Sequence, residues 1–239
     1  DLRSISKYCD RVVLLIKGQK LAEGSPKEMV DLYKRILVST EDEISAVIQE
    51  TSEEENVPAQ ETDEGETAEM NSAVIMQSRI KEASWCSKIQ VNPSVLEYGN
   101  KDAEIIDFVL MDENGVFTNS LEKGKSFTVK MKVQFHEDID DPIFAFTIKD
   151  LKGTEITGTN TMFEHEYVGR QEQGNIRVAE FTQMMNLQGG EYLLSLGCTG
   201  YREADFTVYH RLYDVCSITV ISEKNTVGYY DMNSSVVIF

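Results

Sequence analysis

The clearest pattern in the chain is a strict alternation of apolar and polar residues over 126–135. Phe127, Val129, Met131, Val133 and Phe135 fall on one face, and polar residues occupy every position between them. Successive side chains of a strand point to opposite sides, so this pattern predicts a half-buried strand with one solvated face.

Similar alternation recurs between residue 92 and the C-terminus, over 105–110, 143–149, 176–182, 192–198, 206–212 and 216–221. In 143–149 it assigns Lys149 to the face opposite Phe146. Turn sequences such as Asp112-Glu113-Asn114-Gly115 and Leu187-Gln188-Gly189-Gly190 separate the segments. We therefore predict an all-β fold over 92–239, an antiparallel Ig-like or jelly-roll-like β-sandwich of about eight strands.

The last predicted strand is apolar throughout and consists of Val236, Val237, Ile238 and Phe239. An exposed apolar edge of this kind needs a pairing partner.

Residues 1–38 have a different texture, which predicts a short α+β unit. The apolar run Val12–Ile16 predicts a strand buried on both faces, and a turn at Gly18 folds the chain into a hairpin. Ser25, Pro26 and Glu28 have the spacing of a capping box with proline at the first helical position. A helix is predicted from Pro26 to about residue 37.

Residues 39–91 are predicted to be an acidic, disordered linker. Residues 39–78 contain 12 Asp and Glu and no Lys or Arg, so they account for 12 of the 18 excess negative charges. Few large apolar side chains and many like charges disfavour a packed core. The remainder of the chain is only mildly acidic.

Composition excludes several classes of protein. A net charge of −18 argues against a nucleic-acid partner, because phosphate binding relies on clustered Lys and Arg. The four cysteines lack CxxC spacing, which indicates free thiols in a reducing compartment. No apolar run approaches the roughly 20 residues of a membrane span, and the N-terminus has no signal-peptide layout.

Motifs for catalysis and metal binding are also missing. The three histidines, His136, His165 and His210, form no HxH or HExxH pair, so no metal site is predicted. No Walker A loop and no Gly-x-Ser-x-Gly elbow occurs. Carboxylate pairs such as Glu164 with Glu166 suit glycosidase chemistry only when they converge in a cleft, and solvated loops are the simpler interpretation. No catalytic residue is predicted.

A solvated sheet face with amides, hydroxyls and aromatic rings is suited to sugars, because C–H faces stack on rings while hydroxyls need directed partners. The candidates for carbohydrate binding are Asn160, Thr161, His165, Tyr167, Arg177, Tyr201, Tyr209, His210 and Tyr213. Individually each is weak evidence, since a strand tyrosine more often belongs half to the core.

The N-terminal residues resemble the end of an ABC-transporter nucleotide-binding domain, just after its switch histidine. The resemblance rests on Cys9-Asp10-Arg11-Val12, Leu15-Ile16-Lys17-Gly18-Gln19 and Glu23-Gly24-Ser25-Pro26-Lys27-Glu28-Met29. It implies that residues 1–38 are the C-terminal fragment of such a domain. The ATPase motifs would lie upstream, so ATP and Mg belong to the full-length parent and no cofactor is expected in this fragment.

Residues 99–239 resemble the C-terminal domain of Wzt-type subunits, the nucleotide-binding components of exporters for O-antigen and related lipid-linked polysaccharides. The matching pieces are Tyr98-Gly99, Ala103-Glu104-Ile105, the run 141–150, Gly158-Thr159-Asn160-Thr161, Leu187-Gln188-Gly189-Gly190-Glu191-Tyr192, Tyr213-Asp214 and Gly228. A nucleotide-binding end joined by a linker to a β domain is the Wzt arrangement, so the two resemblances support each other.

The resemblance implies a carbohydrate-binding module that dimerises by exchanging its C-terminal strand, residues 236–239, between protomers. It also implies a transmembrane subunit as a partner of the parent ATPase domain, and a cytoplasmic location peripheral to the inner face of the cell membrane. Two alternatives stay open at this point: a dimerisation or docking domain that never touches sugar, and a glycan-modifying enzyme with two convergent acids about 5–10 Å apart.

Overall fold

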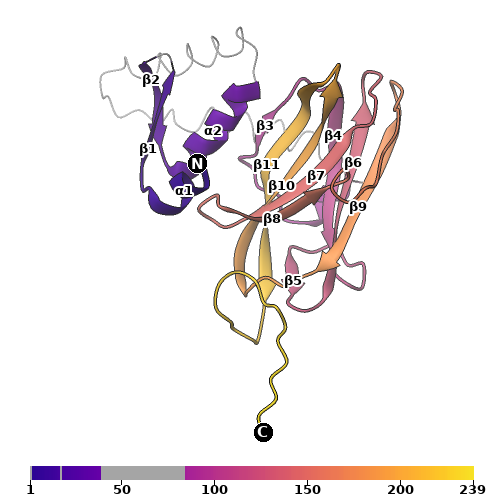
Figure 1. The fold of residues 1–239 in the computed structure, drawn as a ribbon. Coiled ribbons are helices and arrows are strands. Elements are labelled where there is room, and N and C mark those ends of the chain that lie inside the picture. The colour runs from indigo at the N-terminus through magenta and orange to yellow at the C-terminus, as the bar shows by residue number, and fades with distance from the viewer. Residues whose placement is uncertain (1, 17, 39–83) are drawn as a thin grey trace.

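The computed structural model describes residues 2–16, 18–38 and 84–239, and within them a β-sandwich of nine strands forms the largest unit (Figure 1). One sheet has the order β3-β11-β10-β7-β8, with β5 beside β11, and the other has the order β4-β6-β9. All pairings are antiparallel except that of β5 with β11. The predicted antiparallel β-sandwich is confirmed.

The strands of the larger sheet are β3 (Leu96–Tyr98), β5 (Ser120–Glu122), β7 (Ile143–Lys149), β8 (Glu155–Asn160), β10 (Gly190–Arg202) and β11 (Asp205–Ile221). Those of the smaller sheet are β4 (Ala103–Met111), β6 (Ser126–Phe135) and β9 (Ile176–Met184). Strand β6 has the predicted bounds and alternates between buried and half-buried residues along its whole length.

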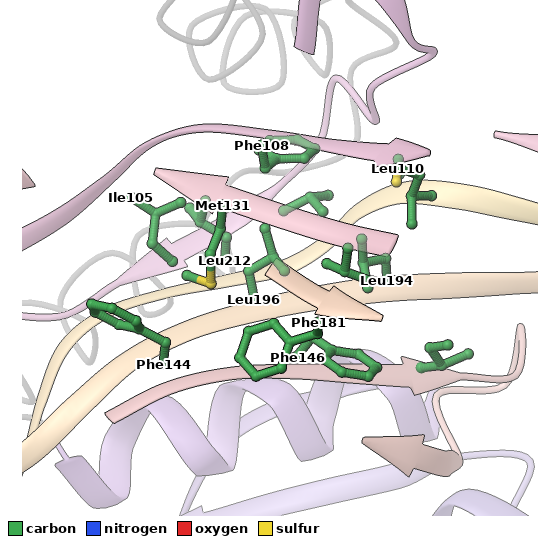
Figure 2. Packing of buried hydrophobic residues seen from close by; sticks show 14 of the residues in the cluster. Ile105, Phe108, Leu110, Met131, Phe144, Phe146, Phe181, Leu194, Leu196 and Leu212 are labelled. Atoms are coloured by element: carbon green, nitrogen blue, oxygen red, sulfur yellow. The ribbon is translucent and has the colours of Figure 1, made fainter. Parts of the chain in front are cut away.

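The core lies between the two sheets, where their inward side chains interdigitate (Figure 2). Phe108, Met131 and Phe181 from the smaller sheet meet Phe146 and Leu196 from the larger one (Figure 2). The rings of Phe146 and Phe181 pack edge to face, with centroids 5.3 Å apart and planes inclined at 61°. Burying each aromatic side chain of this kind stabilises the fold by about 1.5–3 kcal/mol.

The observed strands differ from the predicted ones in three ways. Residues 206–212 and 216–221 form one strand, because β11 shifts register against β10 across Tyr213–Val215 instead of ending there. Strands β3, β5 and β8 were missed because two are only three residues long and β8 is rich in Thr and Gly. Residues 236–239 form no strand in the described single chain.

The N-terminal segment comprises α1 (Leu2–Tyr8), β1 (Val12–Ile16), β2 (Gln19–Gly24) and α2 (Pro26–Val38). The hairpin and the capping box are as predicted: Ser25 N–H donates to Glu28 Oε2 (3.1 Å), and Glu28 N–H donates to Ser25 Oγ (3.4 Å). The prediction that β1 is buried on both faces is wrong. Val13 and Leu15 are exposed, because α2 packs on only one side of the hairpin.

Most of the predicted acidic linker, residues 39–83, lies outside the described residues. The remaining residues of that region, 84–91, pack on the sandwich. The backbone N–H groups of Trp85 and Cys86 donate to the Asp107 carboxylate (2.9 and 3.1 Å), and the Trp85 ring lies beneath the ammonium groups of Lys130 and Lys132. A short 3-10 helix, η1 (Cys86–Lys88), follows Trp85.

All four cysteines are free, with Cys9 exposed and Cys86, Cys198 and Cys216 buried. Burial raises the pKa of the Cys216 thiol to about 12, so this thiol stays protonated and serves as an apolar packing group.

Candidate functional site: a groove between the open sheet edges

A hollow over the sandwich core opens where β8 and β9, the edge strands of the two sheets, approach each other. Its volume is about 820 Å³. Phe144, Phe146 and Phe181 contribute apolar surface, while the threonines and glutamates of β8, β9 and the β8–β9 loop contribute polar groups. An aromatic floor with hydrogen-bonding walls can bind a polyhydroxylated ligand, whose C–H faces and hydroxyl groups need different partners.

Strand β8 can line this groove because Gly158 has no side chain. A Cβ atom at this position would lie 2.5 Å from the Phe146 carbonyl oxygen, which is closer than packing permits. Thr157 and Thr159 flank the glycine and also line the groove. The Thr159 hydroxyl donates to Glu164 Oε1 at 2.5 Å, so one wall is tied to the β8–β9 loop.

The β8–β9 loop is held by two of the predicted site residues. Asn160 Oδ1 accepts a hydrogen bond from Phe163 N–H (2.8 Å), and Thr161 Oγ1 accepts one from Phe144 N–H (3.2 Å). His165 adopts a left-handed backbone conformation, with φ of 60°. This turn leaves Tyr167 projecting at the groove with 69% of its surface exposed, where a ring is free to stack on a ligand.

Arg177 is the only basic residue that lines the groove among the described residues, and it is already engaged. Its Nε–H donates to Gln171 Oε1 at 2.6 Å, and Gln171 in turn is buried and donates to the carbonyls of Val168 and Gly169. The bond to Gln171 positions the guanidinium through its Nε.

Gln183 also lines the groove. Its side-chain Nε2 is buried and has no hydrogen-bond partner within the described part of the chain. Leaving a buried donor unsatisfied costs about 1–3 kcal/mol, so an acceptor on a bound molecule would recover a penalty that the chain otherwise carries.

A second hollow of about 220 Å³ adjoins the groove and shares Thr161, Glu166 and Tyr167 with it. Tyr201 lines this second hollow, at the β10–β11 hairpin, and its ring packs edge to face on Phe206 (5.8 Å, 70°). The structure thus brings Thr161, Tyr167, Arg177 and Tyr201 around one connected surface. Asn160, at the end of β8, and His165, on the β8–β9 loop, lie beside it.

The other three predicted residues are buried, so none of them is open to a ligand in this structure. Tyr209, His210 and Tyr213 are 1%, 0% and 4% exposed. Tyr209 belongs to the sandwich core, and Tyr213 lies under α2 with its hydroxyl 3.1 Å from that of Tyr98. Alternation along β11 distinguished two faces, but it did not indicate that both faces are covered.

His210 has a structural role. Its Nδ1 accepts a hydrogen bond from Ile105 N–H (2.9 Å), so Nε2 carries the proton and donates to Glu97 Oε1 (2.9 Å). Together with the Lys101 ammonium, this bond holds the pKa of Glu97 well below its usual value. Glu97, Glu104 and His210 have the proximity of metal ligands, and hydrogen bonds and ion pairs within the described chain engage all three.

The C-terminal segment is anchored to the sandwich at Asp231. This carboxylate pairs with the ammonium groups of Lys123 (3.1 Å) and Lys224 (2.8 Å) and accepts from Asn233 N–H (2.9 Å). Beyond this point the chain extends away from the sandwich (Figure 1), and the four apolar residues 236–239 are 69–113% exposed.

The fold and the groove define a β-sandwich module for binding or docking. A family model described as the Wzt C-terminal domain matches residues 94–232, which is more than half of the chain. The chain belongs to this family. Its fold is that of a carbohydrate-binding or docking module of an ABC transporter for polysaccharide export, and the domain is non-catalytic.

One solved structure agrees with the family assignment, and two others are more distant. A crystal structure of the C-terminal domain of Wzt is 28% identical, with a TM-score of 0.60 over 65% of this chain and 95% of that one. A CARDB domain from Pyrococcus furiosus is 11% identical (TM-score 0.31, covering 52% and 97%). A β-glucosidase from Listeria innocua is 14% identical (TM-score 0.31, covering 52% and 17%). Curated protein sequences include no match to the chain.

Membership of this family gives the chain a role in a transporter that has a transmembrane partner. None of the helices in the described part of the chain combines the length and apolar character needed to cross a membrane.

Sequence reasoning missed several polar groove residues, chiefly Thr157, Thr159, Glu164, Glu180 and Gln183. Their only signal was position: each lies on or beside an edge strand. That signal required knowing that β8 and β9 are edges on the same side of the sandwich.

Proposed function

We propose that the chain recognises a lipid-linked, O-antigen-type polysaccharide for export by an ABC transporter, and that the glycan lies in the groove between β8 and β9. The observation that supports this most directly is the combination, in one open groove, of an aromatic floor, an exposed Tyr167 ring and the unpartnered Gln183 amide. Aromatic rings stack on sugar C–H faces, and the amide supplies a directed donor for a hydroxyl group.

Charge narrows the glycan class. Glu164, Glu166 and Glu180 line the groove against a single described basic residue, Arg177, so the lining carries more negative than positive charge. Desolvating an anionic sugar beside these carboxylates is unfavourable. The groove therefore favours a neutral or amino-substituted polymer over uronate-rich or phosphate-bridged ones.

The test is a calorimetric titration of the chain with the polysaccharide of its own organism and with polygalacturonate as an anionic probe. Tyr167→Ala and Gln183→Leu should each weaken binding of the native polymer about tenfold, which corresponds to about 1.4 kcal/mol. Tyr8→Ala is the matched control, because it removes a similarly exposed tyrosine from the N-terminal segment. Unchanged affinity in both groove variants would refute this placement of the glycan.

Dimerisation is a second candidate function, favoured by the exposed apolar residues 236–239. Exchange of this segment between two copies would bury it against a sheet edge and supply its missing backbone partners. Deleting residues 236–239 should then convert a dimer into a monomer in analytical ultracentrifugation. A truncated chain that remains a folded dimer would exclude strand exchange.

On this proposal the chain itself binds no cofactor, and the ATP and Mg of the parent protein act upstream. The parent would lie at the inner face of the cell membrane, attached through its transmembrane partner. Docking of the sandwich to the transporter without contact to sugar is the alternative, and absence of binding to the native polysaccharide at high concentration would favour it.

A further inference from the structure

Helix α2 carries a stripe of charged residues that faces the sandwich and not the solvent. Lys27, Asp31 and Lys34 lie four and three positions apart, which places them on one face of the helix. Figure 1 shows α2 alongside the sandwich, on the side of β3 and β11. Each of the three side chains pairs with an opposite charge there.

The outer two pairs are partly solvated. Lys27 Nζ lies 2.8 Å from Asp214 Oδ2, and Lys34 Nζ lies 2.7 Å from Glu155 Oε1. The middle pair is buried: Asp31 Oδ1 lies 3.4 Å from Lys149 Nζ, and the Lys149 side chain is 1% exposed. Three cations therefore meet three carboxylates, so the contact has no net charge.

The sandwich is shaped to receive this stripe. Lys149 Nζ also contacts Asp214 Oδ1 (3.4 Å) and lies 4.1 Å from the centre of the Tyr213 ring. Asp214 adopts a left-handed conformation (φ 55°) within the register shift of β11. Its carboxylate is fixed by the Ser195 hydroxyl, which donates to Oδ1 (3.3 Å) and accepts from Asp214 N–H (3.0 Å).

A backbone contact provides independent support. Gly153, in the β7–β8 turn, has φ of +82°, and a Cβ atom there would lie 2.9 Å from Lys27 Cγ and 3.4 Å from Lys27 Cα. The turn thus lies so close to the helix that only glycine fits at this position. Steric fit and charge complementarity coincide at the same place.

A lysine is almost never fully buried unless it is paired, because removing its charge from water is costly. Asp31 of α2 supplies one of the two carboxylates that pair with the buried Lys149, so the contact with α2 contributes directly to this pairing.

We propose that α2 and the sandwich face around Lys149 and Asp214 form a built docking interface, which holds the β-sandwich in one orientation relative to the N-terminal segment. This contact then fixes the orientation of the sandwich relative to α2. This inference does not depend on any glycan or on the groove.

The test measures a distance between the two segments by pulsed electron paramagnetic resonance. Nitroxide labels are placed on the native exposed Cys9 and on Glu191→Cys, since the other three cysteines are buried and the two labelled positions belong to different segments. The parent chain should give one narrow distance distribution. A broad distribution in the parent would overturn the proposal.

Lys27→Glu/Lys34→Glu places like charges opposite Asp214 and Glu155, and it should lower the ratio of docked to undocked chains about a hundredfold. Adding Glu155→Lys restores one pair and should recover about tenfold of that loss. Lys88→Glu/Lys125→Glu, on the sandwich outside this contact, changes net charge equally and should leave the distribution narrow. Circular dichroism checks that all variants stay folded.

Unchanged distances in the double reversal, or no recovery on adding Glu155→Lys, would show that α2 and the sandwich do not dock through these charges. Recovery by Glu155→Lys cannot arise from general unfolding of the N-terminal segment, because the added change lies on β8.

Discussion

Replacing Lys149 with methionine should destabilise the sandwich strongly. Its ammonium lies 3.4 Å from both Asp31 and Asp214, whose side chains are 9% and 6% exposed. Lys149→Met keeps most of the side-chain volume but leaves two buried carboxylates facing each other. Breaking a buried pair by removing one partner costs about 3–5 kcal/mol. Lys27, which still contacts Asp214, should bring the loss to the lower half of that range.

The matched variant Asp31→Asn should behave differently. Burial raises the pKa of Asp31 above its usual value even though Lys149 opposes the shift. A carboxyl whose pKa is raised on folding contributes stability below its unfolded value, and this contribution is lost as pH rises through the folded value. At pH 7 the ionised Asp31 therefore lowers the free energy of unfolding. Asp31→Asn, which removes this charge, should change the free energy of unfolding by less than about 1 kcal/mol.

Urea denaturation at pH 7 measures both variants, followed by far-UV circular dichroism and by fluorescence of Trp85, the single tryptophan. Lys149→Met/Asp31→Asn should recover part of the loss, because only one carboxylate then lacks Lys149. A cost below about 1 kcal/mol for Lys149→Met, or an equal cost for Asp31→Asn, would refute the argument from uncompensated burial.

Other predictions follow from the core, the groove and the Glu97 cluster. Phe146→Ala should cost about 3–5 kcal/mol in urea denaturation, whereas a loss below about 1 kcal/mol would mean that the core collapses around the site. Gly158→Val should displace β8, and its cost in free energy of polysaccharide binding, measured by calorimetry, should exceed its cost in free energy of unfolding. Affinity equal to that of the wild type would contradict the close approach of β8 to Phe146. Because His210 lowers the pKa of Glu97, that stabilisation is fully present above the unfolded value of about 4.5 and lost as pH falls. The wild type should therefore lose stability below that pH more steeply than Glu97→Gln, and parallel pH profiles would contradict this.

Much of the sandwich was predictable because alternation reports burial directly. Strand β6 has one face on the core and one toward solvent along its length, so its pattern gave its bounds. Lys149 shows the limit of that reasoning. Alternation assigned it to the outer face of β7, which is correct, but the outer face is covered by α2 and the lysine is buried.

The groove was predictable only in part, since its parts come from two edge strands that pair with different sheets. Thr161, Tyr167 and Arg177 were identified by residue type, and they line it. Tyr213 has the same side chain as Tyr167, but helix α2, which is distant in sequence, covers it. Local patterns identify groups that suit a ligand, whereas topology decides which of them reach one.

The anchor at Asp231 also sets a geometric limit on assembly. Two lysines hold this carboxylate, which also accepts from Asn233 N–H, and Phe239 lies six residues beyond Asn233. An extended chain spans at most about 3.3–3.6 Å per residue, so Phe239 reaches about 20 Å from that anchor. A sheet edge that accepts the C-terminal segment must therefore lie within that radius, which restricts how two copies can be arranged.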